Sequence, residues 1–200
     1  MPDYDKSVFI NCPFDKKYKS LYEAMIFTII ACDFTPRCSR EFNNADDVRI
    51  NNIMNLIRDC KYSIHDISRA DSRLNMPLEL GLFLGCKQYG TQKIKNKSCM
   101  ILEAENYDSK AYLSDLAGQD FYNHQNKVNK MIESVRTWLA PKSPNAAVIP
   151  HSQYLISRYR DFNRNYLPGV LILKNWTKAE MSFNEYVVTI QGWIALNPIF

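Results

Sequence analysis

The sequence has no glycine-rich phosphate-binding loop. Its six glycines form neither a GxGxxG nor a GxxxxGK[ST] motif. The first motif is typical of Rossmann dehydrogenases and the second of P-loop enzymes, because glycine lets the backbone approach a phosphate closely. Their absence argues against both classes of protein.

The sequence also lacks the cysteine spacing of a metal site. Its six cysteines show no CxxC pairing, and most of them lie in apolar runs: Cys12, Cys32, Cys38, Cys60, Cys86 and Cys99. This pattern is typical of reduced core thiols in a cytosolic protein. We expect no bound metal and no resident cofactor.

No apolar stretch approaches the roughly 18 residues of a membrane span. The first residues, MPDYDKS, lack the basic start and apolar run of a signal peptide. The net charge of +4 is mild, and the basic residues are scattered along the chain instead of forming a stripe. We therefore expect a cytoplasmic protein that binds neither membranes nor nucleic acid.

What the sequence does contain is an alternation of strand-length apolar runs and segments of helical period. Strands are predicted at 7–11, 34–38, 62–67, 98–103 and 119–122. Helices are predicted at 18–30, from an Asp46 cap to 60, after Asn75, near 111–116 and at 128–138. This alternation predicts a doubly wound, flavodoxin-like α/β fold with a parallel five-stranded sheet in the order 2-1-3-4-5.

The chain divides into three parts. Residues 1–140 carry the α/β pattern, and residues 141–150 contain three prolines and are expected to be a linker. Residues 151–200 form a helical C-terminal extension, in which Thr177 and Glu180 are predicted to cap the last helix. Its aromatic faces are expected to pack on the core, with a dimer contact or a lid as the alternative roles.

Glu79 is the most unusual residue of the chain. It lies at the start of an otherwise apolar helix, where Asn75 suits the N-cap and Pro77 the first turn. The free amides of a helix start favour a negative charge, so we expect Glu79 to be ionised at neutral pH. In the alternative role, Glu79 only caps its own helix or pairs with Arg69 or Arg73.

Polar residues follow the first and third strands, where ligands bind in open α/β sheets. The predicted ligand-contacting residues are Phe9, Asn11, Pro13, Phe14, Asp15, Arg37, His65, Asp66, Ser68, Arg69 and Asn75. Arg37 and Arg40 are placed to meet a phosphate. His65 is a catalytic or a structural histidine, and Phe9 and Phe14 stack on a ligand ring or pack in the core.

Two motifs resemble a known superfamily. The segment VFINCPFD, followed by D-x-S-x(6)-N-x-P-x-E-L-G, is similar to the nucleoside 2-deoxyribosyltransferase and TIR superfamily, and especially to bacterial stand-alone TIR-like antiphage proteins. The resemblance covers about residues 7–139. Residues 73–78 depart from the small-residue run of the transferases, and the tryptophan-cysteine pair frequent in TIR enzymes is missing.

The resemblance implies that Glu79 is the catalytic carboxylate. TIR-like enzymes cleave the nicotinamide–ribose bond of NAD, here the substrate, and yield ADP-ribose or a cyclic or conjugated signal that a downstream effector protein reads. Deoxyribosyltransferases and nucleoside hydrolases act instead on nucleosides, for which Asp66 or Asp15 would be the general acid. A non-catalytic nucleotide-sensing module is the third alternative. A homo-oligomer is also expected.

Overall fold

A parallel β-sheet forms the centre of this computed structural model, which describes residues 3–42, 48–69, 73–92, 94–105, 113–116 and 120–199. The strands are β1 (Ser7–Asn11), β2 (Thr35–Arg37), β3 (Tyr62–Asp66), β4 (Ser98–Glu103) and β5 (Phe121–Asn123). Neighbouring strands run parallel in the order β2-β1-β3-β4-β5. This order confirms the predicted flavodoxin-like fold, whose strand order reverses between β1 and β3.

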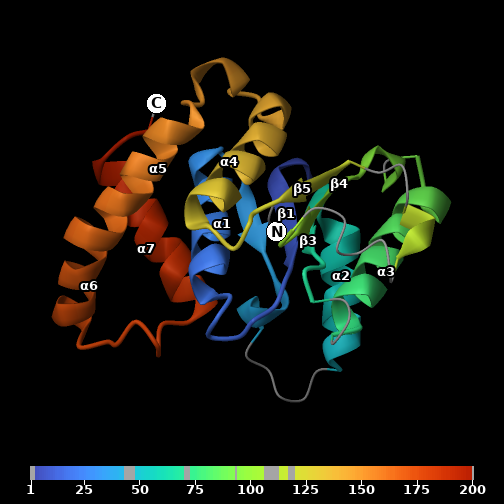
Figure 1. The fold of residues 1–200 in the computed structure, drawn as a ribbon, viewed down its shortest axis with the longest axis horizontal. Helices are drawn as coiled ribbons and strands as arrows, with labels where there is room; N and C mark the ends of the chain where they lie inside the picture. Colours follow the sequence, from blue (N-terminus) through green and yellow to red (C-terminus); the bar gives the residue numbers. More distant parts are fainter. Residues whose placement is uncertain are drawn as a thin grey trace.

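Helices cover both faces of the sheet (Figure 1). One face carries α1 (Lys19–Ala31) and α4 (Val128–Leu139), and the other carries α2 (Arg49–Asp59) and α3 (Asn75–Tyr89). Successive side chains of a strand point to opposite faces. In β1, Val8 and Ile10 therefore enter the core shared with α1 and α4, whereas Phe9 enters the core shared with α2 and α3.

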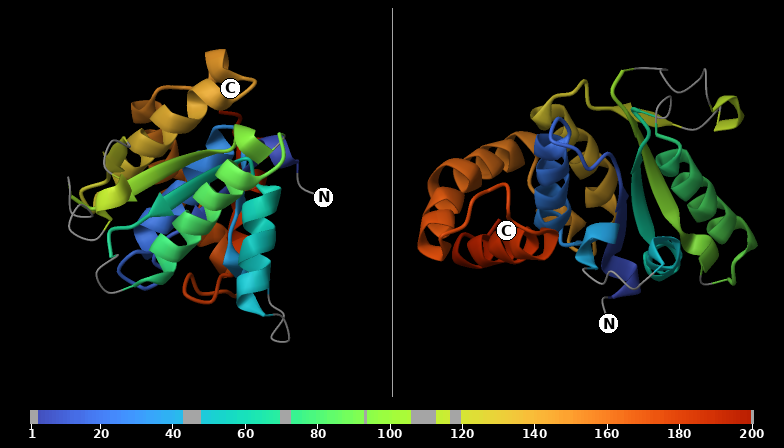
Figure 2. Two further views of the ribbon diagram at one scale, coloured as in Figure 1. Left: turned by 90° about the vertical axis from the view of Figure 1, so that its right-hand side faces the viewer. Right: turned by 90° about the horizontal axis from the view of Figure 1, so that it is seen from below.

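The helical extension packs on the outer side of α1 and α4 (Figure 2). It consists of α5 (Ser152–Asp161), a π-helical segment (Phe162–Tyr166), α6 (Leu167–Lys174) and α7 (Phe183–Leu196). The Phe27 ring of α1 lies 5.2 to 5.8 Å, centroid to centroid, from the rings of Tyr159, Phe162 and Trp193. The aromatic faces thus pack on the core, as expected. None of the described helices has the length and apolar character needed to cross a membrane.

Residues 141–150, expected to be a linker, are held against α4. The Arg136 guanidinium donates hydrogen bonds to the backbone oxygens of Ile149 (2.9 Å) and Pro150 (2.8 Å). The Ile149 side chain is buried in the main core. This segment therefore joins the sheet to the helical extension through packed contacts.

The start of α3 differs from the prediction. Asn75 is the first helical residue, and Leu74 occupies the N-cap position without a side-chain hydrogen bond. The predicted cap Asp46 lies outside the described residues, and so does part of the helix predicted near 111–116. The described part of that segment contains a 3-10 turn at Ser114–Leu116.

The C-terminal helices also differ from the prediction. The capping box of α7 is made by Ser182 and Glu185, whereas Thr177 and Glu180 bond each other in the preceding turn. Both pairs fit the capping-box spacing, so spacing alone could not select the helix start. Helix α6 was not predicted, because its sequence LPGVLILK is almost uniformly apolar and shows no helical period.

Lys97 is a buried cation that completes the end of α2. Its Nζ donates hydrogen bonds to the backbone oxygens of Ile57 (2.7 Å), Arg58 (3.2 Å) and Cys60. We expect Lys97→Ala to lower the free energy of unfolding by about 2 kcal/mol, because these helix-end oxygens lose their charged donor. Urea unfolding measures the loss against Lys17→Ala, which removes an exposed lysine. Equal stability of the two variants would contradict this role.

Candidate functional site

Glu79 lies one turn into α3, at the carboxyl edge of the sheet. In the same turn, the Met76 backbone oxygen accepts a hydrogen bond from Asn11 Nδ2 at the end of β1 (2.9 Å). Burial raises the pKa of the Cys12 thiol, and the charges of Asp66 and Glu79 add to this rise. Glu79 is therefore within electrostatic reach of the first residue after β1, close to the point where the strand order reverses.

The Glu79 carboxyl group is half-buried and unpaired. It makes no hydrogen bond or ion pair with any other described residue. Burial raises its pKa to about 7, and the positive charge of Arg49 opposes this rise only in part. The expectation that Glu79 is ionised at neutral pH is therefore wrong: burial outweighs the charge of Arg49, and both protonation forms are populated.

Arg69 and Arg73, considered as partners of Glu79, both bind Asp15. Arg73 Nη2 lies 3.2 Å from Asp15 Oδ2, and Arg69 Nη1 binds the same oxygen. Burial would raise the pKa of Asp15, but the hydrogen bond from the Tyr18 amide and the two arginines outweigh it and lower the pKa. Asp15 is therefore an ionised tether between the loop after β1 and the segment before α3. An ionised group of low pKa is a poor general acid.

Asp66, at the end of β3, is the centre of a buried polar network. Its side chain is fully buried and accepts hydrogen bonds from the Tyr18 hydroxyl, the Ser68 amide (3.0 Å) and the Ser68 hydroxyl (2.5 Å), and His124 Nε2 lies 2.9 Å from its Oδ2. These four contacts surround its oxygens. Asp66 therefore joins the start of α1 to the loops after β3 and β5, and as placed it does not face a ligand.

Ser68, His124 and Asp66 do not form a catalytic triad. In a triad, one histidine nitrogen faces the acid and the other faces the serine. Here Nε2 of His124 faces both Asp66 and Ser68 (3.0 Å), and Nδ1 accepts a hydrogen bond from the Asn126 amide (3.1 Å). His124 was missed in the sequence, although its place after β5 at the same sheet edge could have identified it.

His65 is a structural histidine. Burial lowers its pKa to about 3, so the ring is neutral. Its Nδ1 faces Asn11 Nδ2 (2.9 Å), a donor, and its Nε2 therefore carries the proton and donates to Ser63 Oγ (2.9 Å). Because Asn11 also binds Met76 of α3, His65 helps to fix the position of the helix that carries Glu79.

This burial predicts a pH dependence of stability. Below pH 6.5 the unfolded chain protonates His65 but the folded chain does not, so stability is present above that pH and is lost as the pH falls towards 3. We expect wild type to lose about 2 kcal/mol more than His65→Asn between pH 7.5 and 5. Urea unfolding at both pH values measures the difference. If the two proteins differ in free energy of unfolding by the same amount at both pH values, the result would contradict a neutral, buried His65 ring.

The two predicted stacking residues have different surroundings. Phe9 is 1% exposed and packs between α2 and α3, so it belongs to the core. Phe14 is half-buried, and the Arg40 guanidinium lies 4.9 Å from the centre of its ring. Arg40 Nη2 also donates to the Phe14 backbone oxygen (2.9 Å). Of the two rings, only that of Phe14 is positioned to contact a ligand.

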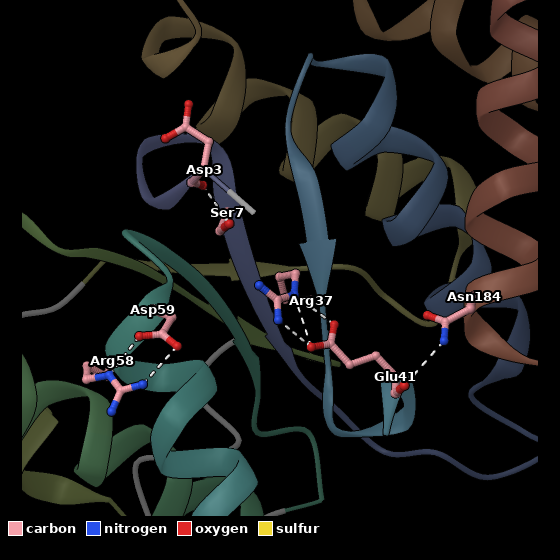
Figure 3. A network of polar contacts seen from close by, with 7 residues as sticks. All are labelled: Asp3, Ser7, Arg37, Glu41, Arg58, Asp59 and Asn184. Atoms are coloured by element: carbon pink, nitrogen blue, oxygen red, sulfur yellow. Dashed lines mark hydrogen bonds and ion pairs between the residues drawn. The ribbon is translucent and has the colours of Figure 1, made fainter. Parts of the chain in front are cut away.

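Arg37, predicted to meet a phosphate, is bound by Glu41 (Figure 3). Its Nε and Nη2 lie 2.8 and 2.5 Å from the two carboxylate oxygens. The Glu41 backbone oxygen in turn accepts a hydrogen bond from Asn184 of α7 (3.2 Å). Arg37 therefore anchors the turn after β2, and it is Arg40 that faces the loop after β1.

A cavity of about 580 Å³ lies beside this loop. Residues 13–16 line it from one side, and residues before and at the start of α7 line it from another: Lys178, Ala179, Met181, Ser182 and Phe183. Glu79 and the exposed Asn75 are not among its lining residues. The predicted binding residues are thus divided: Pro13 and Phe14 line the cavity, whereas Asn11 and His65 support α3.

The described structure is that of an α/β protein with an unpaired carboxyl group at the reversal point of its sheet. Comparison with protein-family models, with curated proteins and with solved structures finds no match to this chain. The residues of the site and their geometry therefore carry the functional inference.

Proposed function

We propose that this protein is an enzyme that breaks the N-glycosidic bond of NAD, with Glu79 as its catalytic carboxylate. Hydrolysis would give ADP-ribose, and capture by another nucleophile would give a cyclic or conjugated ADP-ribose. The observation that carries the proposal is the unpaired, half-buried Glu79 carboxyl group with a pKa of about 7. It lies where open α/β sheets bind ligands.

The chemistry needs one negative charge in a poorly hydrated place. Breaking the bond builds positive charge on the ribose, and a nearby carboxylate stabilises that charge or captures the sugar covalently. The nicotinamide ring of NAD is cationic, so its approach favours the ionised form of Glu79. Nicotinamide then leaves as a neutral molecule and needs no proton from the enzyme.

Three buried or ion-paired groups would position the reacting parts. The Asn11–His65 pair fixes the first turn of α3, Asp66 fixes the end of β3, and Asp15 fixes the loop after β1. We assign these residues positioning roles. Electrostatic catalysis depends on such fixed geometry. A charged group that has to move or change its surroundings during the reaction stabilises the transition state less than a group that is already in place.

The resemblance to TIR-like and deoxyribosyltransferase proteins supports a catalytic role for Glu79. It matches the nucleophilic glutamate in the similar E-L-G helix start of deoxyribosyltransferases and the glutamate on the corresponding helix of TIR enzymes. As part of the proposal, the nucleotide product is a cytoplasmic signal read by an effector protein in antiphage defence. Assembly of several copies would be one way to switch such an enzyme on.

A deoxyribosyltransferase or nucleoside hydrolase is the second candidate function. The observation that favours it is again the Glu79 pKa of about 7, because about half of the molecules then hold a proton at neutral pH. A neutral purine or pyrimidine leaves more readily when an acid protonates it. As the general acid, in place of Asp66 or Asp15, Glu79 would act in its protonated form, whereas the NAD reaction needs its ionised form.

Mass spectrometry of the products distinguishes the candidates. The wild-type chain at high protein concentration is incubated separately with NAD and with a mixture of deoxynucleosides. We expect nicotinamide from NAD, and the mass of the accompanying product identifies a hydrolase, a cyclase or a transferase. Free base from deoxynucleosides alone would overturn the NAD proposal in favour of the second candidate. NAD binding without any product would favour the non-catalytic module.

A further inference from the structure

The cavity beside the loop after β1 has the size and walls of a small-molecule site. Its volume of about 580 Å³ lies within the range of roughly 300–1,000 Å³ that is usual for such sites. The rings of Phe14, Tyr22 and Phe183 line it. The ring centroids of Phe14 and Tyr22 are 5.3 Å apart, and those of Tyr22 and Phe183 are 6.5 Å apart. Such a wall suits a flat ring, which aromatic side chains contact over a large area.

A buried carboxylate lies in the same wall. Glu23 is 6% exposed, and its Oε2 is 2.8 Å from Lys178 Nζ. Among the described residues, the only charged partner of its Oε1 is the more distant Lys19 Nζ, at 3.9 Å. A carboxylate oxygen accepts more than one hydrogen bond, so Oε1 can accept an N–H from a ring placed in the cavity.

The rim of the cavity carries two uncompensated positive charges. Lys19 and Lys178 are paired with Glu23, and Asp15 is paired with arginines outside the cavity. In the described part of the chain, Lys16 and Arg40 have no acidic partner, and Arg40 stacks on Phe14. An anionic group held at this rim would meet both cations.

We propose that this cavity is a second ligand site, for a small nitrogen-containing aromatic ring that bears an anionic group, of the kind found in nucleoside monophosphates. The ring lies among Phe14, Tyr22 and Phe183 with an N–H donated to Glu23. The anionic group lies between Lys16 and Arg40. The site is separate from Glu79 and does not depend on the reaction proposed above.

Calorimetric binding of AMP, adenosine and inorganic phosphate to the full chain tests the proposal. We expect AMP to bind more tightly than either of the other two, because each of them lacks half of the recognised groups. Lys16→Glu is expected to weaken AMP binding about tenfold and to leave adenosine binding unchanged. Lys17→Glu makes the same charge change on an exposed neighbour outside the cavity and is expected to have little effect.

Two further variants locate the binding. Met181 lines the cavity and is half-buried, so Met181→Trp fills the space and is expected to abolish AMP binding while the chain still unfolds cooperatively. Glu79→Gln is expected to keep AMP binding, because Glu79 is not among the lining residues. Absence of AMP binding to wild type, or AMP binding that survives both Met181→Trp and Lys16→Glu, would overturn the second site. Neither result bears on turnover of NAD.

Discussion

Glu79→Gln is expected to slow nicotinamide release from NAD by about 1000-fold, which is the order of effect seen when one stabilising group is removed from a transition state. Glutamine has nearly the same shape as glutamate but cannot carry the negative charge that the ribose cation needs. Its effect should appear in kcat, because that charge acts mainly in the transition state. Stopped time courses of nicotinamide release by wild type and variant measure the ratio.

Glu79→Gln is also expected to change the stability of the folded protein. The folded pKa of Glu79, about 7, exceeds the ordinary value of 4.5, so its contribution to stability is present in full below pH 4.5 and is lost as the pH rises to about 7. Glu79→Gln is therefore expected to be about 2 kcal/mol more stable than wild type at pH 8, after a discount for partial exposure, and to lose this advantage as the pH falls to about 4.5. Glu133→Gln is the control: Glu133 on α4 is also partly buried, but it is paired with Lys130 (2.7 Å). If Glu79→Gln is both inactive and less stable than wild type, the result would show that Glu79 has a structural role.

Asp66→Asn is expected to lower the free energy of unfolding by about 3–5 kcal/mol, the largest stability effect that we predict. The substitution turns one acceptor oxygen into a donor amide that faces the donors Tyr18, Ser68 and His124 in a fully buried place. Buried donors without an acceptor cost far more than exposed ones, because no water replaces the lost bond. Urea unfolding at pH 7 measures the loss.

Asp59→Asn is the control for this prediction. Asp59 pairs with Arg58 through two hydrogen bonds of 2.7 and 3.0 Å, but both side chains are about half exposed (Figure 3). Exposed pairs contribute about 0–1 kcal/mol, so this variant should be close to wild type. Similar unfolding curves for the Asp66 and Asp59 variants would contradict the claim that the buried contacts of Asp66 at the end of β3 stabilise the protein.

The sequence predicted the sheet well because each strand is bounded by polar or turn residues and alternates with a helix of clear period. The strand order then followed from the handedness of parallel crossovers. Helix α6 lacked such a period, and the start of α7 had two equivalent capping patterns. In both places the local sequence pattern is ambiguous, and packing against the rest of the protein determines where the helix forms.

The unusual setting of Glu79 could be predicted from the sequence, but its protonation could not. Glu79 could be recognised from its unusual place in an apolar helix, whereas its pKa depends on how much water the folded chain removes. Contacts between residues distant in sequence could not be predicted either. Asp15 binds the arginines that were considered as partners of Glu79, and His124 contacts Asp66 at the carboxyl edge of the sheet. Pairing between residues far apart in the chain needs the fold.

The pH dependence of kcat/KM for nicotinamide release from NAD tests the central claim most directly. This ratio reports the ionisation of groups in the free enzyme. If ionised Glu79 stabilises the ribose cation, kcat/KM rises through pH 7 and levels off by about pH 8, and Glu79→Gln shows no such rise. A rate that is constant between pH 5.5 and 8.5, or that Glu79→Gln reproduces, would contradict the claim that Glu79 is the catalytic carboxylate.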